Sequence, residues 1–127
     1  DNAGYFASGP SWLDGPYVLD QKALFEALLG GIEAGAPADR LALDFHVAVA
    51  RSSARIAREI CAREDIDTVA LSGGVFMNQL LLQLLTRELK DAGLTVLVPQ
   101  TVPVNDGCIA YGQAAVARTR LAQVAPQ

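Results

Sequence analysis

The chain has 127 residues, a length that fits one domain or part of a larger one. Hydrophobic residues make up 51% of it and charged residues 19%, which argues against a disordered chain. The formal net charge of −4 gives no electrostatic support to nucleic acid or an anionic membrane surface as a main partner, and no apolar run approaches the roughly 18 residues needed to span a bilayer. Position 1 is not Met and the sole Met is Met77, so we expect the natural protein to begin upstream.

The first part of the chain predicts a loop followed by a helix. Residues 1–19 carry five glycines or prolines and little periodicity, so we expect a loop or linker there. Asp20 is suited to cap a helix that reaches about Glu33. Five apolar residues of this helix recur at helical spacing and predict one apolar stripe: Leu24, Phe25, Leu28, Leu29 and Ile32.

A long second helix is predicted from about Ala38 to Arg63, after a break at Gly35-Ala36-Pro37. One face carries residues three to four positions apart that we expect to face a core: Leu41, Phe45, Val49, Ser52, Ile56 and Ile60. Charged residues take much of the opposite side and indicate a solvated face: Arg51, Arg55, Arg58 and Glu59.

A strand–helix–strand unit follows. Two short apolar runs, Thr68 to Leu71 and Leu94 to Val98, predict buried strands. The helix between them is predicted from Val75 to about Ala92, with Gly93 as the C′ glycine. One face of this helix carries leucines that we expect to be core rather than a partner groove: Leu80, Leu81, Leu84, Leu85 and Leu89. Such a unit implies a parallel strand pair with a right-handed crossover. Two strands are too few for an independent sheet, so we expect further strands from upstream sequence, a second copy or residues 1–19.

The last predicted helix opens at Asn105-Asp106-Gly107 and runs to about Ala117. We expect Tyr111 to be a packing residue. The small residues of this helix would let it pack very close to its neighbours: Ala110, Gly112, Ala114, Ala115 and Ala117. We expect residues 20–120 to form one α/β unit with flanking helices and residues 121–127 to form a frayed tail.

The first candidate binding site is the turn from Ser72 to Asn78. A strand runs through Gly73 and Gly74 into a helix, so free backbone N–H groups and the positive end of the helix dipole favour an anion. Glycine also lets a phosphate or ribose approach the backbone. Asn78 would sit one turn into the helix, where its amide can donate to and accept from a sugar hydroxyl or a base edge. The alternative, a tight turn that needs glycine only for its geometry, stays open.

The second candidate follows the second strand. Asp106 could cap the last helix, or its carboxylate could bind a divalent cation beside a nucleotide. Gly107 would allow close approach of the backbone. Both turns follow strands whose carboxyl ends share one edge of an open α/β sheet, where ligands collect. The pairing favours one shared nucleotide site.

Together the two turns resemble a known family. Ser72-Gly73-Gly74-Val75-Phe76-x-Asn78, followed about 25 residues later by Pro103-x-Asn105-Asp106-Gly107-x-Ile109-Ala110-x-Gly112-Gln113, resembles the C-terminal part of HypF, the carbamoyltransferases of nickel–iron hydrogenase maturation. The resemblance covers roughly residues 18–119 and includes Ala42-x-x-Phe45-His46. It implies that the chain is a partial subdomain of an actin/Hsp70-like ATPase fold, akin to the threonylcarbamoyl-transfer proteins.

The resemblance also implies an activity for the full-length protein. In that family carbamoyl phosphate and ATP give carbamoyl-adenylate in a separate YrdC-like domain. The fold seen here then passes the carbamoyl group to the C-terminal cysteine of a HypE partner, where it becomes a cyanide ligand of the hydrogenase iron. The expected cofactors are therefore ATP or carbamoyl-adenylate, together with a divalent metal in the full-length protein.

Carried over by position, the resemblance implies these nucleotide-binding residues: Ser72, Gly73, Gly74, Val75, Asn78 and Gly107. It implies Asp106 as a metal ligand and assigns no catalytic residue. Cys108 stands where the family usually has a second Gly, and Met77 where it often has Gln. The paired histidines of the family's HxxxH motif are absent, as are its acylphosphatase-like, zinc-finger-like and YrdC-like domains. We therefore expect weak or no metal binding and little turnover by this chain alone.

The remaining candidates leave alternatives open. His46, the sole histidine, is either a packing residue or a group that lines the nucleotide cleft. Cys61 and Cys108 are isolated thiols, which argues against structural zinc and a disulfide framework and fits a reducing cytoplasm; Cys108 also lacks an evident base, so we do not expect a nucleophile. The alternative functions are an O-carbamoyltransferase of another branch and a noncatalytic interaction module of the same fold. Apolar surface left by a missing half would favour self-association.

Overall fold

The computed structural model describes residue 19 and residues 21–124. The described chain forms, in order, α1 (Gln21–Glu33), α2 (Ala38–Glu64), β1 (Thr68–Ala70), the 3₁₀ turn η1 (Gly74–Met77), α3 (Gln79–Asp91), β2 (Thr95–Leu97), the 3₁₀ turn η2 (Asp106–Cys108) and α4 (Ile109–Val124). The loop expected before residue 19 and the cap expected at Asp20 lie outside the described residues. No helix within the described residues combines the length and the apolar composition that crossing a bilayer requires.

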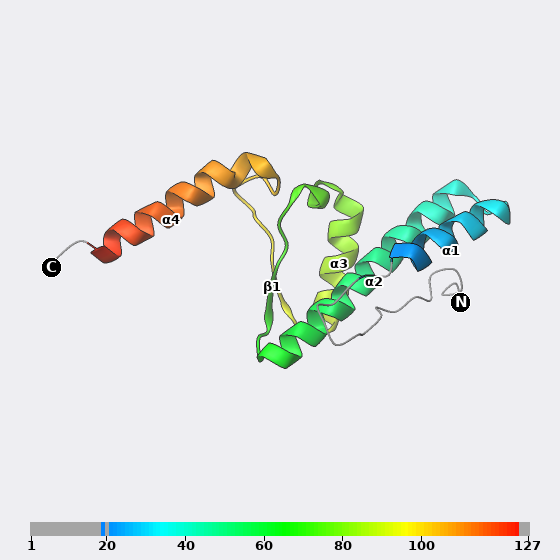
Figure 1. The fold of residues 1–127 in the computed structure, drawn as a ribbon, viewed down its shortest axis with the longest axis horizontal. Helices are drawn as coiled ribbons and strands as arrows, with labels where there is room; N and C mark the ends of the chain where they lie inside the picture. The colour runs from blue at the N-terminus through cyan, green and yellow to red at the C-terminus, as the bar shows by residue number, and fades with distance from the viewer. Residues whose placement is uncertain (1–18, 20, 125–127) are drawn as a thin grey trace.

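The two strands form a parallel sheet, so the predicted strand–helix–strand unit is confirmed. Its register pairs Thr68 with Thr95, Val69 with Val96 and Ala70 with Leu97. Figure 1 shows α3 running beside the strand pair, α2 packed against α3, and α1 lying along the far part of α2. Gly93 follows α3 with φ 81°, which confirms the predicted left-handed glycine at the end of this helix.

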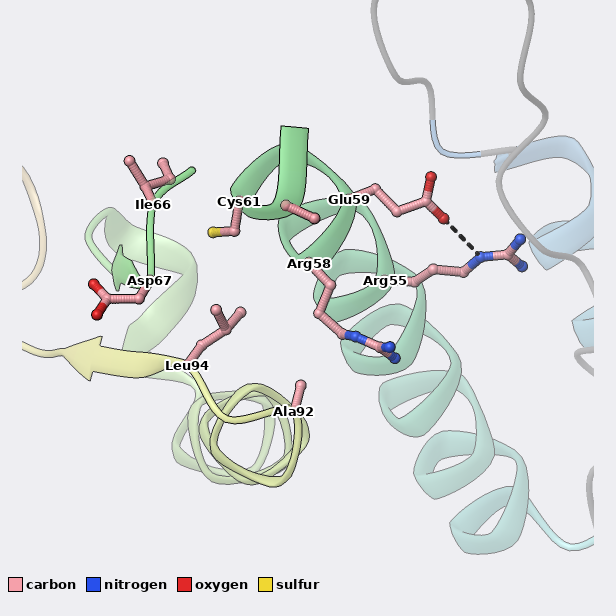
Figure 2. A pocket seen from close by; sticks show the side chains of 9 residues that line it. Arg55, Arg58, Glu59, Cys61, Ile66, Asp67, Ala92 and Leu94 are labelled. Atoms are coloured by element: carbon pink, nitrogen blue, oxygen red, sulfur yellow. Dashed lines mark ion pairs between the residues drawn. The ribbon is translucent and has the colours of Figure 1, made fainter. Parts of the chain in front are cut away.

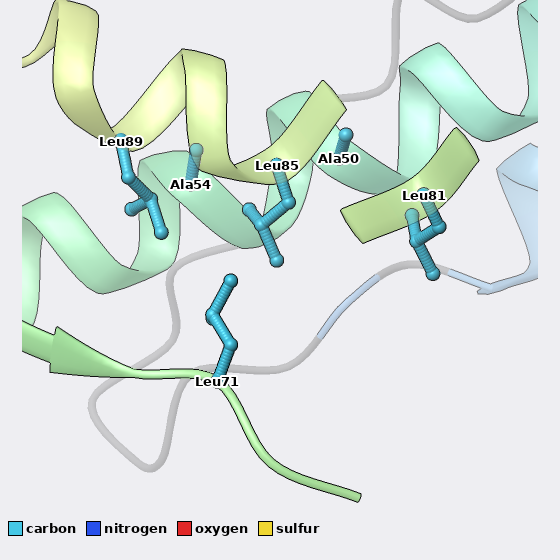
Figure 3. Close-up of a cluster of buried hydrophobic side chains, with 6 residues drawn as sticks. All are labelled: Ala50, Ala54, Leu71, Leu81, Leu85 and Leu89. Carbon is cyan, nitrogen blue, oxygen red and sulfur yellow. The ribbon is translucent and has the colours of Figure 1, made fainter. Parts of the chain in front are cut away.

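The core lies where α2, α3 and the end of β1 meet (Figure 3). Its buried side chains are Ala50 and Ala54 of α2, Leu71 after β1, and Leu81, Leu85 and Leu89 of α3. Leu89 is completely buried, whereas Leu80 of the predicted leucine face is 41% exposed. The alanines of α2 leave room for the leucines of α3, so the expectation that this leucine face is core holds for Leu81, Leu85 and Leu89.

The predicted apolar stripe of α2 needs a correction. Only Leu41 and Ser52 of that stripe are buried, and its other members are half-buried. The face that packs against α3 consists of small side chains, Ala50 and Ala54, and Ala48 is buried as well. The four charged residues on the opposite side, Arg51, Arg55, Arg58 and Glu59, are exposed as predicted.

The prediction of two buried strands is wrong for one face of the sheet, although Leu71, at the end of the first predicted run, is buried. Val69 and Val96 turn toward the core, but the residues on either side of each valine are exposed. Leu97, for example, is 54% exposed. The helices cover one face of the sheet, and nothing within the described chain covers the other.

The apolar stripe predicted for α1 is also mostly uncovered. Leu24 is buried and Gly31 lies against the Leu41 side chain of α2, so α1 packs along one line of contact. The remaining large side chains lie beside that line, and three of them are more than half exposed: Phe25 55%, Leu29 57% and Ile32 57%. The stripe predicted for α1 is therefore wider than the surface that α2 offers it.

The last helix, α4, departs most from expectation. It continues past the predicted end at Ala117 to Val124, so residues 121–124 are helical rather than frayed; alanine, leucine, arginine and glutamine favour helix there. Every side chain from Ile109 to Gln123 is exposed, and Tyr111, expected to pack, is 67% exposed. Figure 1 shows α4 projecting away from the other helices. The close packing predicted from its small residues is absent within the described chain.

Candidate functional site

The first candidate turn, residues 72–78, forms a sharp bend that we call the Gly73 corner. The chain enters it from the buried Leu71. Gly73 has φ 117° and ψ 156°, a conformation that is essentially restricted to glycine. The backbone then passes through η1, so the helix does not follow the glycines at Val75 as predicted but begins at Gln79.

Asn78 is the N-cap of α3. The prediction that it lies one turn into the helix is therefore wrong. Its Oδ1 accepts a hydrogen bond from the Leu81 N–H at 3.1 Å, which satisfies one of the unpaired amides at the helix start. Its Nδ2 lies 2.8 Å from Nε2 of His46 on α2. His46 Nδ1 in turn lies 2.7 Å from the carbonyl oxygen of Ala42. Asn78 is therefore bonded at both ends of its side-chain amide.

The second candidate turn, residues 103–108, forms what we call the Asn105 corner. Asn105 caps η2, because its Oδ1 accepts from the Gly107 N–H at 3.1 Å. The alternative in which Asp106 caps the last helix is therefore wrong. Asp106 is the first residue of η2, and its side chain is exposed. A Cβ on Gly107 would lie 3.1 Å from Asn105 Oδ1, so glycine lets the capping side chain fold over the backbone.

The structure brings the two corners side by side. The Gly73 N–H donates to the Val104 carbonyl at 2.7 Å. Asn105 Nδ2 donates to Met77 Sδ at 3.5 Å, and a Cβ built on Gly74 would lie 4.0 Å from Asn105 Cβ. These contacts follow from the parallel register, which ends both strands at the same edge of the sheet. The shared edge predicted from the sequence is therefore present.

Not all of the backbone donors expected at the Gly73 corner are free. The Gly73 N–H donates to the Val104 carbonyl, so it is not among the free amides predicted at this turn. In the described part of the chain, the N–H groups of Gly74 and Val75 donate to no backbone carbonyl. No atom lies within 4 Å of a Cβ built on Gly73, and Ser72 and Val75 are exposed. The corner thus offers two amides and open space to an anion.

The described residues of this chain do not make up a metal site by themselves. Asp106 supplies one exposed carboxylate. Among the described residues, no group of three or more His, Cys, Asp or Glu side chains converges on one point. A divalent cation takes several oxygen ligands, so Asp106 could contribute only one of a set completed by other chain.

A surface hollow of about 470 Å³ lies elsewhere and is not part of the candidate site. Its lining includes Arg55, Arg58, Glu59 and Cys61 of α2 and two residues that precede the strands, Asp67 and Leu94 (Figure 2). It therefore lies at the amino ends of the strands, away from the two corners. Ligands in open α/β sheets collect at the carboxyl ends, and Arg55 is already paired with Glu59 at 3.6 Å. Cys61 is buried there and Cys108 is half-buried in η2.

Sequence reasoning missed two participants. The sequence leaves His46 as either a packing residue or a cleft residue, because its bond to Asn78, 32 positions away, has no signal in the sequence. Met77 was noted only as a departure from a family pattern, although its sulfur contacts the capping residue of the other corner. Both contacts depend on how α2 and the second corner fold back onto the first.

The chain is similar to proteins of known name over most of its length. Residues 6–113 match the family described as "Carbamoyltransferase, Kae1-like Domain, second subdomain". The carbamoyltransferase HypF homolog of Cupriavidus necator is 39% identical over 113 residues, which cover 87% of this chain and 29% of that protein. The carbamoyltransferase HypF of Rhodobacter capsulatus is 36% identical over 104 residues, covering 82% of this chain and 13% of that protein. The chain thus spans less than a third of either relative.

Solved structures agree with the sequence comparison. The crystal structure of a full-length HypF in its phosphate- and nucleotide-bound form superposes with a TM-score of 0.82 at 30% identity, over 90% of this chain and 15% of that one. The crystal structure of the HypF of T. kodakarensis superposes with a TM-score of 0.69 at 29% identity, over 94% of this chain and 16% of that one.

Proposed function

The chain belongs to the HypF carbamoyltransferase family, and from that membership we propose that its two corners form part of the nucleotide site of an ATP-dependent carbamoyltransferase. The proposed nucleotide contacts are Ser72, Gly73, Gly74, Val75, Asn78 and Gly107. The observation that carries the proposal is the 2.7 Å hydrogen bond from Gly73 to Val104, which joins the corners into one surface. Support also comes from a structurally similar HypF that was crystallised in a phosphate- and nucleotide-bound form.

The chemistry of the Gly73 corner suits a nucleotide phosphate. The amides of Gly74 and Val75 donate to no backbone carbonyl in the described chain, and amides at such a turn attract negative charge. The space over Gly73 is open, so a phosphate can reach these amides without meeting a side chain. Asn78, fixed at the start of α3, would contact the ribose or the base.

For the full-length protein we propose carbamoyl transfer to a HypE-like acceptor in the cytoplasm. Carbamoyl phosphate and ATP would give carbamoyl-adenylate in another domain. The acceptor's C-terminal cysteine sulfur would then bond to the carbamoyl carbon, the bond from that carbon to the adenylate phosphate would break, and AMP and a proton would leave. The carbamoyl group would go on to form a cyanide ligand of a nickel–iron hydrogenase. Asp106 would give one carboxylate to a metal whose other ligands lie outside this chain.

The test is nucleotide binding by the chain and by the full-length protein. ADP or ATP should raise the midpoint of thermal unfolding, and Gly74→Asp should weaken binding about tenfold or more, because a carboxylate there meets the phosphate at a few ångströms. Gly30→Asp is the matched control: it makes the same change on α1, where no atom lies within 4 Å of the added Cβ, and should leave affinity unchanged.

Two results would contradict the proposal. If neither protein shows a nucleotide-dependent shift, the corners are not a nucleotide site, and a noncatalytic interaction module becomes the better account. If Gly74→Asp and Gly30→Asp weaken binding equally, the nucleotide binds elsewhere and the effect is one of net charge.

A further inference from the structure

We infer that His46 is a positioning residue, which fixes the side-chain amide of Asn78 so that Asn78 presents an N–H donor to a ligand at the Gly73 corner. The identity of the ligand as a nucleotide rests on the proposed function. The orientation of the amide does not, because it follows from hydrogen bonds within the chain. His46 is half-buried on α2 and is not one of the proposed nucleotide contacts, so the route by which it acts is its bond to Asn78.

The proton positions on the His46 ring follow from its neighbours. The carbonyl of Ala42, 2.7 Å from Nδ1, can only accept, so Nδ1 carries the hydrogen of the neutral ring. Nε2 then holds a lone pair and accepts from Nδ2 of Asn78 at 2.8 Å. The ring is thereby held in the Nδ1–H form by α2 itself.

The amide of Asn78 is held from the other side as well. The Leu81 N–H, 3.1 Å from Oδ1, can only donate, so the oxygen belongs at that position. Rotating the amide by half a turn would set two donors against each other at Leu81 and two acceptors against each other at His46. Both hydrogen bonds would be lost together, which excludes the flipped amide.

The fixed amide has a consequence for recognition. Nδ2 carries two hydrogens, of which one is used by His46, so the second is left for a ligand. A ligand group facing this nitrogen must therefore be an acceptor, such as a hydroxyl oxygen or an unprotonated ring nitrogen of a nucleotide. Without His46 the amide would keep only the bond to Leu81, and the direction of Nδ2 would no longer be fixed.

The ring tautomer can be measured directly, because the chain contains a single histidine. The probe is ¹⁵N NMR of the imidazole in its neutral form. We expect a protonated Nδ1 and an unprotonated Nε2, with both signals absent from His46→Gln. An Nε2–H tautomer would overturn the inference, because that ring could not accept from Asn78. The measurement uses the unaltered chain, so it decides the orientation even if a variant fails to fold.

The consequence for the ligand is tested with ADP as the probe. His46→Phe keeps a flat ring but has no acceptor, so ADP should bind about three- to tenfold more weakly, the equivalent of one hydrogen bond. His46→Gln can accept from Nδ2 through its Oε1 and should recover most of that loss. Thermal unfolding midpoints of both variants close to that of the unaltered chain would show that the fold is intact in both.

The outcomes separate this inference from the proposed function. Unchanged ADP binding by His46→Phe, or an equal loss in His46→Phe and His46→Gln, would overturn the role of His46 in recognition. If the unaltered chain and full-length protein bind no ADP, the proposed function fails, and the role in nucleotide recognition fails with it. In that case the measured ring tautomer still tests the orientation of the Asn78 amide, but it says nothing about nucleotide recognition.

Discussion

The two corners are built alike, but one leads to a helix that packs in the core and the other to an exposed helix. Each follows a strand, passes through a 3₁₀ turn and uses an asparagine side chain to cap a backbone amide. The Gly73 corner leads into α3, whose Leu81, Leu85 and Leu89 are buried in the core. The Asn105 corner leads into α4, whose described side chains are all exposed. Local caps therefore suffice to shape a corner, whereas burial depends on what the rest of the chain places beside the helix.

The largest expected effect compares one leucine from each helix. Leu89→Ala should lower the free energy of unfolding by about 2–5 kcal/mol, because it opens a cavity at a completely buried position. Leu121→Ala makes the same change on α4, where the side chain is 73% exposed, and should change it by less than about 0.5 kcal/mol. Urea denaturation of the full chain, followed by circular dichroism, measures both. Equal losses would mean that α4 packs as tightly as α3.

The next effect distinguishes two neighbouring glycines of the Gly73 corner. Gly73→Ala should lower the free energy of unfolding by about 1–3 kcal/mol, because φ 117° and ψ 156° strain any residue with a Cβ. Gly74→Ala should be nearly neutral, since Gly74 has no positive φ and its new Cβ would meet only Asn105 Cβ at 4.0 Å. Urea denaturation again gives the two values. A neutral Gly73→Ala would show that this backbone conformation is not required.

The smallest effect compares the two capping asparagines. Asn78→Ala should lower the free energy of unfolding by about 0.5–2 kcal/mol, because α3 belongs to the core and loses its cap. Asn105→Ala removes the cap of η2, but no described side chain of α4 is buried, so we expect a local loss of helix with little change in global unfolding. Hydrogen exchange of the α4 amides and urea denaturation together separate the two results.

A further variant isolates what the cap contributes at Asn78. Asn78→Asp keeps an oxygen for the Leu81 N–H but loses the donor to His46. Most of the stability lost in Asn78→Ala should return if capping is the main term. A loss as large as that of Asn78→Ala would instead attribute the stability to the contact with His46.

Much of the fold could be predicted from the sequence because its signals are local. The break at Gly35-Ala36-Pro37, the apolar run before Gly73 and the left-handed Gly93 mark where helices and strands begin and end, and the structure follows them closely. Which face of a helix is buried could not be predicted equally well. The leucines of α3 pack against alanines of α2. Which face of α2 is buried therefore depends on how the two helices pack together, and this is not visible in the sequence of α2 alone.

The location of the candidate site could be predicted, but its internal bonding could not. Two strands in parallel must end at one edge, so the sequence places residues 72–78 and 103–108 together. The 2.7 Å bond from Gly73, the capping role of Asn78 and its bond to His46 each need atoms that are distant in sequence. A 3₁₀ turn in place of the first helical turn was also missed, since glycine, valine and phenylalanine give no sharp distinction between the two.

The bond between Gly73 and Val104 joins the corners through main-chain atoms alone. A substitution that changes the side chain at position 104 leaves the carbonyl in place, and only proline at position 73 would remove the donor. The hydrogen bond between the corners therefore tolerates substitutions at position 104, which supplies the acceptor. Relatives that differ at position 104 can keep the two corners side by side. Position 73 is more restricted, because its backbone conformation favours glycine.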